Sequence, residues 1–148
     1  MSKSWLIRVF RAALCDAVIY TLMAVMGLIL LPFAIWSRDG ARWAVQSYCG
    51  AALTLVRWIC GIRVEIRGVM PTGNRLVVAK HQSFLDVLIL SKVLPNPCFI
   101  MKAELRWFPV FGVYAQRLGS VSVQRQSKGK ALFAMLIAVS KTPHSGQL

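Results

Sequence analysis

A histidine and an aspartate, His81 and Asp86, stand five positions apart inside the apolar run VVAKHQSFLDVLIL. Ionisable side chains of these types are scarce in the chain, which has two histidines and five acidic residues among 148. A carboxylate beside an imidazole fixes the tautomer of the ring and stabilises the imidazolium that forms when the ring takes a proton. Such a pair is a general base that can deprotonate an alcohol near neutral pH. The pair therefore makes His81 a candidate general base that Asp86 would orient.

The same stretch also matches a purely structural pattern. Ser83 followed three residues later by Asp86 is a capping box, in which both side chains satisfy free backbone amides at the start of a helix. The helix dipole favours an acidic residue at that position as well. Spacing alone therefore leaves two interpretations open: a catalytic pair, or a helix cap beside an uninvolved histidine.

The elements around the pair predict an α/β fold. RLVVAK has the character of a strand that ends just before His81, and Phe84–Leu94 has helical spacing. Ligands bind where strands end in α/β sheets. Further strands are expected at IRVEIRG, CFIMK and SVSVQR, and further helical segments at Glu104–Leu118, interrupted at Pro109 and Gly112, and at Lys130–Ser140. Strands that alternate with helices indicate an α/β domain, here a mixed sheet with flanking helices.

Two long apolar segments precede this domain. No charge occurs from Ala17 to Ser37, and a helix of that length would extend about 32 Å, close to the hydrocarbon thickness of a bilayer. The second segment, Trp43–Ile62, is interrupted only by Arg57. Small and polar residues form a stripe on each segment: Ala13, Ala17, Thr21 and Ala24 on the first, and Gln46, Gly50, Thr54, Arg57 and Gly61 on the second. Because such stripes let helices approach closely in lipid, we predict a helical hairpin.

We expect the N-terminal hairpin to comprise residues 1–62 and to associate with a membrane, and residues 63–148 to form the N-terminal part of the α/β domain. Basic residues lie at both ends of the hairpin, in the N-terminal flank and in the loop SRDGAR. A hairpin immersed in the cytoplasmic leaflet would place both ends at the same anionic surface, and we favour this over full crossing.

The overall composition favours a membrane partner over nucleic acid. The chain is 57% hydrophobic and carries a formal charge of +13, and its basic residues are scattered among apolar runs. Nucleic-acid binders are basic too, but they are usually polar with clustered Lys and Arg. The four cysteines are widely spaced and form no C-x-x-C pair, so we expect buried thiols and no metal site.

Two blocks of the chain resemble the glycerolipid acyltransferases, and the 1-acyl-glycerol-3-phosphate acyltransferases in particular. HQSFLD is similar to the H-x-x-x-x-D signature of that family, and FIMKAELRWFPVFGVYAQRLGSVSVQR resembles its second block. The position before His81 is Lys80, where the family often has Asn. The apolar N-terminal segment before a basic α/β domain fits as well. The similarity covers about the whole chain.

The resemblance implies transfer of a fatty acyl group from acyl-CoA or acyl carrier protein to the free hydroxyl of a lysophospholipid, with no further cofactor. His81 would be the general base, and Asp86 would orient it. By the match to the second block, Lys102 and Arg125 would bind the substrate phosphate. The expected location is the cytoplasmic face of a bacterial inner membrane. Another acceptor, such as a lyso-aminolipid, and a non-catalytic basic membrane anchor are the alternatives.

The C-terminal end departs from the family. The chain ends SKTPHSGQL, and the Gly–Thr–Arg block expected to contribute to acceptor phosphate binding is absent. We therefore expect a fragment of a longer product. Loss of the strands that complete the sheet would leave an open edge, and poor turnover by the 148-residue chain is expected.

Overall fold

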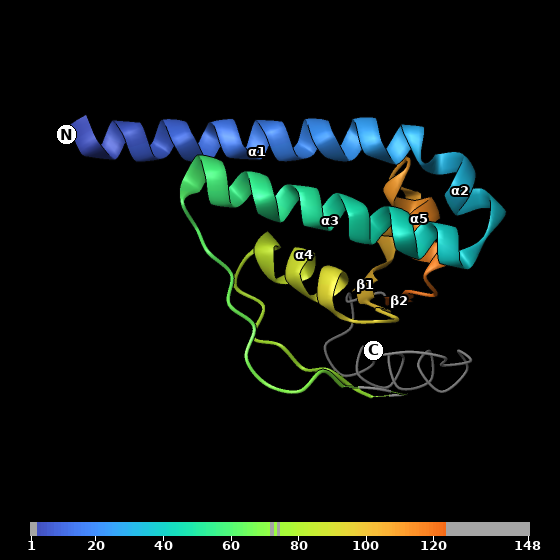
Figure 1. The fold of residues 1–148 in the computed structure, drawn as a ribbon. Helices are drawn as coiled ribbons and strands as arrows, with labels where there is room; N and C mark the ends of the chain where they lie inside the picture. Colours follow the sequence, from blue (N-terminus) through green and yellow to red (C-terminus); the bar gives the residue numbers. More distant parts are fainter. Residues whose placement is uncertain (1–2, 72, 74, 124–148) are drawn as a thin grey trace.

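The computed structural model describes residues 3–71, 73 and 75–123 (Figure 1). Its elements, in chain order, are α1 (Lys3–Ile29), α2 (Leu31–Trp36), α3 (Arg38–Cys60), α4 (Phe84–Val93), β1 (Ile100–Lys102), the 3₁₀ helix η1 (Ala103–Trp107), α5 (Phe111–Arg117) and β2 (Val121–Val123). The described part is mostly helical. The helix expected over residues 130–140 lies outside the described residues.

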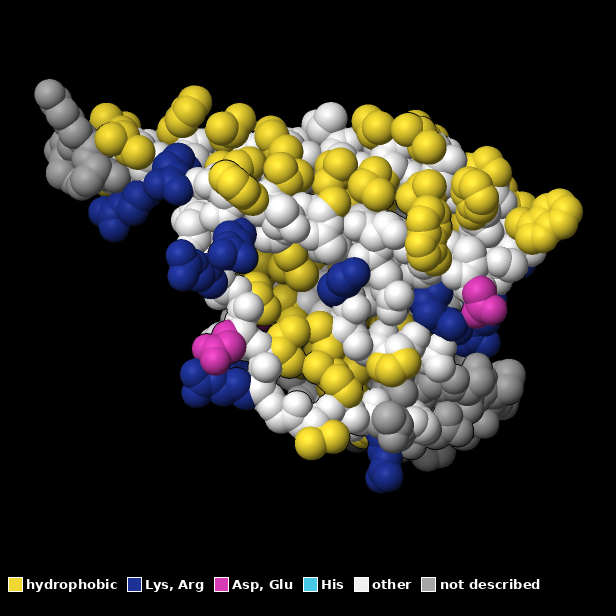
Figure 2. All heavy atoms as spheres, in the orientation of Figure 1, with side chains coloured by type: hydrophobic (Ala, Val, Ile, Leu, Met, Phe, Trp, Pro, Cys, Tyr) yellow, Lys and Arg dark blue, Asp and Glu magenta, His cyan; other side chains and the backbone are white. Residues whose placement is uncertain are grey.

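The first apolar segment folds as two helices. Pro32 lies in the first turn of the short helix α2, where a residue without an N–H is tolerated, and α1 ends before it at Ile29. Within the described residues, the stretch Trp5–Ile29 of α1 is the one helical stretch long and apolar enough to cross a membrane. Many of its large apolar side chains are exposed, and Figure 2 shows them along the outer side of the helix.

Helices α1 and α3 lie side by side, but their predicted small-residue stripes do not meet. The α1 stripe, Ala13 to Ala24, is exposed. The contact is instead a cluster of buried side chains with partly buried neighbours around it: Cys15, Ile19, Cys49, Ala52, Val56 and Leu88. Near the end of α3, the Arg11 Nε also donates to the Ile59 carbonyl at 2.6 Å. The stripe prediction was wrong for α1, which instead packs Cys15 and Ile19 against Cys49, Ala52 and Val56 of α3.

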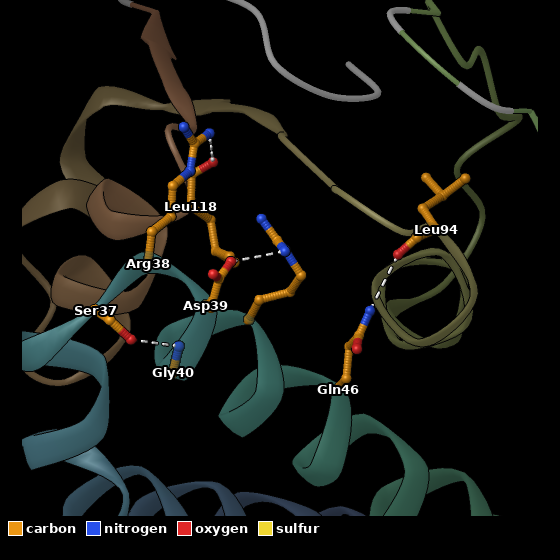
Figure 3. Close-up of polar contacts among 8 residues, drawn as sticks. Ser37, Arg38, Asp39, Gly40, Gln46, Leu94 and Leu118 are labelled. Atoms are coloured by element: carbon orange, nitrogen blue, oxygen red, sulfur yellow. Dashed lines mark hydrogen bonds and ion pairs between the residues drawn. The ribbon is translucent and has the colours of Figure 1, made fainter.

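The small and polar residues of α3 face α4 over part of their length. Gln46 Nε2 donates to the Leu94 carbonyl at 3.1 Å (Figure 3). A Cβ at Gly50 would lie 3.3 Å from the Lys92 side chain. Gln46 therefore satisfies a carbonyl at the end of α4, where the helix has none of its own N–H groups left to do so.

The sheet among the described residues is small. β1 and β2 pair in parallel, with Met101 opposite Ser122. Their apolar residues form a cluster with buried Cys98, whose Sγ donates to the Gly119 carbonyl at 2.8 Å. The strands expected at CFIMK and SVSVQR are thus confirmed over three residues each, although the latter run continues beyond the described residues.

Two predicted strands, IRVEIRG and RLVVAK, are not strands in the structure. Apolar and charged side chains of both segments are exposed, and no strand among the described residues pairs with either. Alternation assigns side chains to two faces, but a strand also needs a neighbour to complete its hydrogen-bonded ladder. The mixed sheet that we expected is therefore reduced to one parallel pair in the described part.

The segment after β1 folds in two pieces, as expected, with a break at Pro109 between η1 and α5. The break predicted at Gly112 is wrong, since this residue lies inside α5 and is buried. A Cβ at Gly112 would overlap the Arg106 carbonyl, so glycine permits η1 and α5 to approach. The α5 helix is tied to α1 by the Tyr114 hydroxyl, which donates to the Gly27 carbonyl at 3.0 Å.

Candidate active site

The first turn of α4 holds the Asp86 carboxylate in place. Ser83 is the N-cap residue, with extended backbone angles, and Asp86 occupies the third helical position. Asp86 Oδ2 accepts the backbone N–H of Gln82 at 2.7 Å and that of Ser83 at 2.9 Å. Both amides precede the helix and have no carbonyl partner within it, so the carboxylate supplies the missing acceptor. The capping box predicted from the sequence is present.

The same carboxylate oxygen also contacts the histidine. His81 Nδ1 lies 3.3 Å from Asp86 Oδ2. The His81 side chain is 66% exposed and that of Asp86 is 30% exposed, so the imidazole projects outward from a carboxylate fixed at its base. The helix cap is therefore present, and the oxygen that caps the helix also contacts the ring. The catalytic role of the pair stays a prediction.

Hydrogen bonds hold the pKa of the Asp86 carboxyl below its usual value. The backbone N–H groups of Ser83 and Gln82 make the largest contributions; partial desolvation opposes them, and His81 lowers the pKa by a still smaller amount. Asp86 is therefore a carboxylate at neutral pH, able to accept a proton-bearing Nδ1 and to stabilise a positive ring.

The position of the ring fits general-base chemistry. With Nδ1 turned toward Asp86, Nε2 is the ring nitrogen that faces away from the carboxylate, and it has no hydrogen-bond partner among the described residues. A neutral imidazole with hydrogen on Nδ1 has its lone pair on Nε2, which can accept a proton from an alcohol.

The start of α4 is held against the N-terminal helices. The Phe84 ring stacks on Tyr20 of α1, with 6.2 Å between the ring centroids. Leu88 is buried in the α1–α3 cluster, and Leu85 packs against that cluster. The sequence pattern did not reveal this support, although the large apolar Phe84 at the start of the helix was an available signal for an apolar contact. The candidate site is thus built on α1 and α3 as well as on α4.

The structure does not bring the other predicted site residues to this pair. Lys102 ends β1 and pairs with Glu104, with 3.4 Å between Nζ and Oε1, and both side chains are well exposed. It makes no hydrogen bond or ion pair with His81 or Asp86. Arg125 lies outside the described residues. Across the described part of the chain, no group of three His, Cys, Asp or Glu side chains is placed to hold a metal ion.

Comparison with known proteins decides the family. The model of the family described as Acyltransferase matches residues 61–146. The chain belongs to this family. It is 32% identical over 105 residues to a 1-acyl-sn-glycerol-3-phosphate acyltransferase of Pseudomonas aeruginosa, which is 70% of this chain and 39% of that relative. To the human 1-acyl-sn-glycerol-3-phosphate acyltransferase alpha it is 37% identical over 84 residues, 54% of the chain and 30% of the relative.

A third relative differs in its named acceptor. The chain is 31% identical over 123 residues, 80% of its length, to a lyso-ornithine lipid O-acyltransferase of Rhizobium meliloti, of which it covers 39%. The chain thus spans about two fifths or less of the length of these curated acyltransferases. No solved structure matches it. The resemblance seen in the motifs is confirmed at the level of the family.

Proposed function

We propose that this acyltransferase moves a fatty acyl group from acyl-CoA or acyl carrier protein to the free hydroxyl of 1-acyl-glycerol-3-phosphate, forming phosphatidic acid. The observation that carries the proposal is the contact between His81 Nδ1 and Asp86 Oδ2, on the HQSFLD motif, with the far side of the ring exposed. Membership of the family supplies the reaction class.

The reaction needs no acyl-enzyme. His81 Nε2 takes the proton of the acceptor hydroxyl while the hydroxyl oxygen attacks the thioester carbonyl carbon. A C–O bond forms, the C–S bond breaks, and the departing thiolate recovers the proton from the imidazolium. Asp86 stabilises the imidazolium while it carries the proton. Cys98 takes no part, because its thiol is buried and donates to the Gly119 carbonyl.

Lys102 and Arg125 complete the proposal as cationic groups for the acceptor phosphate. Lys102 follows β1 on an exposed strand end, where its ammonium is already paired with Glu104. Binding a phosphate would require Lys102 to exchange that carboxylate for the ligand, and exposed pairs of this kind are weak enough to allow the exchange. Arg125 follows β2 by two residues in the sequence.

The proposed setting is the cytoplasmic face of a bacterial inner membrane, with the N-terminal helices as a membrane hairpin over residues 1–62. The exposed apolar side of α1 and the packing of α3 against it support this setting. Because α4 rests on the same two helices, the His81–Asp86 pair would lie close to the lipid surface that carries the acceptor. The division into a hairpin and an α/β domain from residue 63 stays a prediction.

A lyso-ornithine lipid is the second candidate acceptor, since a relative covering 80% of the chain carries that name. Both acceptors present a hydroxyl to the same base, and they differ in whether a phosphate accompanies it. Competition between the two lysolipids in one assay separates them: preference for the phosphate-bearing acceptor supports the first proposal, and preference for the lyso-ornithine lipid supports the second.

The decisive experiment is His81→Ala. Product formed from radiolabelled oleoyl-CoA and lysophosphatidic acid should fall by about 10²–10⁴-fold, the usual contribution of a general base, while binding to lipid vesicles stays unchanged. Gln82→Ala is the matched control, because Gln82 contributes its backbone N–H and not its side chain to the site. Equal product formation by His81→Ala and the native protein would overturn the general-base role of His81, and no product from either would favour a non-catalytic membrane anchor.

A further inference from the structure

A groove opens where α3 ends. Its lining residues precede the His81–Asp86 pair by about 20 positions in the sequence, and the proposed reaction does not use them. It has a volume of about 430 Å³ and is lined by Arg57, Trp58, Gly61 and Arg63. Two of these four residues are arginines, none is acidic, and Trp58 is 80% exposed. Figure 2 shows Lys and Arg side chains gathered at this end of the molecule, below the first turns of α1.

The turn at Gly61 brings the two arginines to one groove. Gly61 is the C-cap of α3 and has a left-handed backbone conformation, with φ of 74°. Its N–H donates to the Arg57 carbonyl at 3.0 Å, which closes the last turn of the helix. The chain leaves α3 in a new direction there, so Arg63 lines the same space as Arg57 although it lies beyond the helix.

These two arginines differ from their neighbours in having no protein partner. Arg11 donates to the Ile59 carbonyl, and Arg67 forms a two-point ion pair with Glu65, with N–O distances of 2.9 and 3.0 Å. The side chains of Arg57 and Arg63 make no hydrogen bond or ion pair with any described residue, and both are exposed. Two unpaired guanidinium groups facing one groove are a natural match for a doubly hydrogen-bonding anion.

We propose that this groove binds a phosphate group, and that its usual source is the headgroup of a glycerophospholipid at the membrane surface. Arginine presents planar pairs of N–H donors that match phosphate oxygens. An exposed tryptophan beside them is typical of the boundary between lipid and water, where its apolar ring and its N–H are both accommodated. The exposed apolar side of α1 begins at the same end of the molecule, which favours a lipid over a soluble phosphate as the source.

Such a site would fix the distance between the bilayer and the candidate active site. Val56, next to Arg57 in α3, belongs to the buried cluster that contains Leu88 of α4. The groove and the start of α4 therefore rest on the same rigid contact, and a headgroup held at the groove would keep the HQSFLD turn at the surface. Phosphate binding does not depend on acyl transfer, so it can be tested whether or not the proposed reaction is right.

The test uses the purified protein in maltoside micelles, which carry no phosphate. Short-chain phosphatidic acid, the matching diacylglycerol without phosphate, and inorganic phosphate are titrated separately by calorimetry. We expect phosphatidic acid to bind and diacylglycerol to bind much more weakly. Arg57→Gln and Arg63→Gln should each weaken phosphatidic acid binding about five- to tenfold, and together about 25- to 100-fold.

Arg67→Gln is the matched control, because it removes the same formal charge from an arginine that already has Glu65 as a partner. Its effect should stay within about twofold. The double variant Arg57→Lys/Arg63→Lys keeps both charges without the planar donor pairs, so it should bind phosphatidic acid more tightly than the double glutamine variant and more weakly than the native protein. His81→Ala should bind phosphatidic acid normally even though it fails in acyl transfer.

Three outcomes decide the matter. Loss of phosphatidic acid binding in the double glutamine variant, with Arg67→Gln unaffected, supports the site and its lipid source. If inorganic phosphate binds as tightly and shows the same pattern, the phosphate site stands but its source is soluble. Equal binding by the double glutamine variant and Arg67→Gln would overturn the proposal, since a diffuse positive surface would then explain the affinity.

Discussion

Replacing Asp86 with asparagine separates the helix-capping role of this side chain from its proposed catalytic role. An asparagine can keep an oxygen where Asp86 Oδ2 now accepts the N–H groups of Gln82 and Ser83, so the start of α4 should remain capped. The substitution removes the negative charge 3.3 Å from His81 Nδ1. Any loss of activity without loss of helix therefore reports the contribution of that charge to catalysis.

The expected size follows from the distance. Two unit charges 3.3 Å apart interact strongly enough to change an equilibrium about tenfold in bulk water, and a few thousandfold at the effective dielectric of a protein surface. The His81 ring is 66% exposed in the free protein, which places the pair toward the aqueous limit. Bound lipid and thioester would cover the His81 ring and strengthen its charge interaction with Asp86. We expect kcat to fall by roughly 100-fold, between these limits.

The assay compares kcat for acyl transfer from oleoyl-CoA to lysophosphatidic acid with the helical circular dichroism signal. Asp39→Asn is the matched control, because Asp39 also lies in a first helical turn and pairs with Arg42 at 2.9 Å, remote from the site in the sequence. Asp86→Asn should lose activity and keep its helix, and Asp39→Asn should keep both. A kcat for Asp86→Asn within twofold of the native value would refute the catalytic role and leave the cap as its whole function.

Three further predictions test the surroundings of the site. Because the pKa of Asp86 is lowered in the folded protein, its carboxylate stabilises the fold at pH values above the pKa of an unfolded aspartate, and this stabilisation is lost as the pH falls through the lower folded-state pKa. The difference in melting temperature between the native protein and Asp86→Asn should therefore disappear in acid. A difference that stays constant with pH would contradict this. Gly112→Ala should destabilise the protein by about 1–3 kcal/mol in thermal unfolding, since the added Cβ meets the Arg106 carbonyl, and an unchanged melting temperature would show that η1 and α5 separate without cost. Tyr114→Phe should cost about 1 kcal/mol through loss of the hydrogen bond to the Gly27 carbonyl, and it should leave the contact between His81 and Asp86 intact by NMR.

Features set by neighbouring residues were predictable from the sequence. The start of α4 follows from Ser83 and Asp86, which satisfy local amides and need nothing from the rest of the fold. The strand cores of β1 and β2 follow from apolar residues next to a turn, and the break at Pro109 follows from its missing N–H. In each case the cause lies within a few positions of the effect.

Features that depend on distant partners were not predictable. Residues 62–67 alternate as a strand would, yet without a neighbouring strand among the described residues they form none. The small-residue stripe of α1 faces outward because packing is decided by the face that α3 offers. The groove at Gly61 was missed for the same reason, although an arginine on each side of a glycine that ends a helix was a readable signal.

The histidine and the aspartate lie in an apolar run because α4, which follows His81, needs apolar residues for packing and a polar group to cap its first turn. The apolar residues of α4 bury against α1 and α3, and this fixes the first turn in space. The Asp86 carboxylate accepts hydrogen bonds from two backbone amides as well as contacting the ring, so its position does not depend on His81. Helix capping by Asp86 is therefore compatible with its proposed role in orienting His81. A carboxylate that is already immobilised by the helix can hold an exposed imidazole in one orientation, which a freely rotating acid on the surface cannot do.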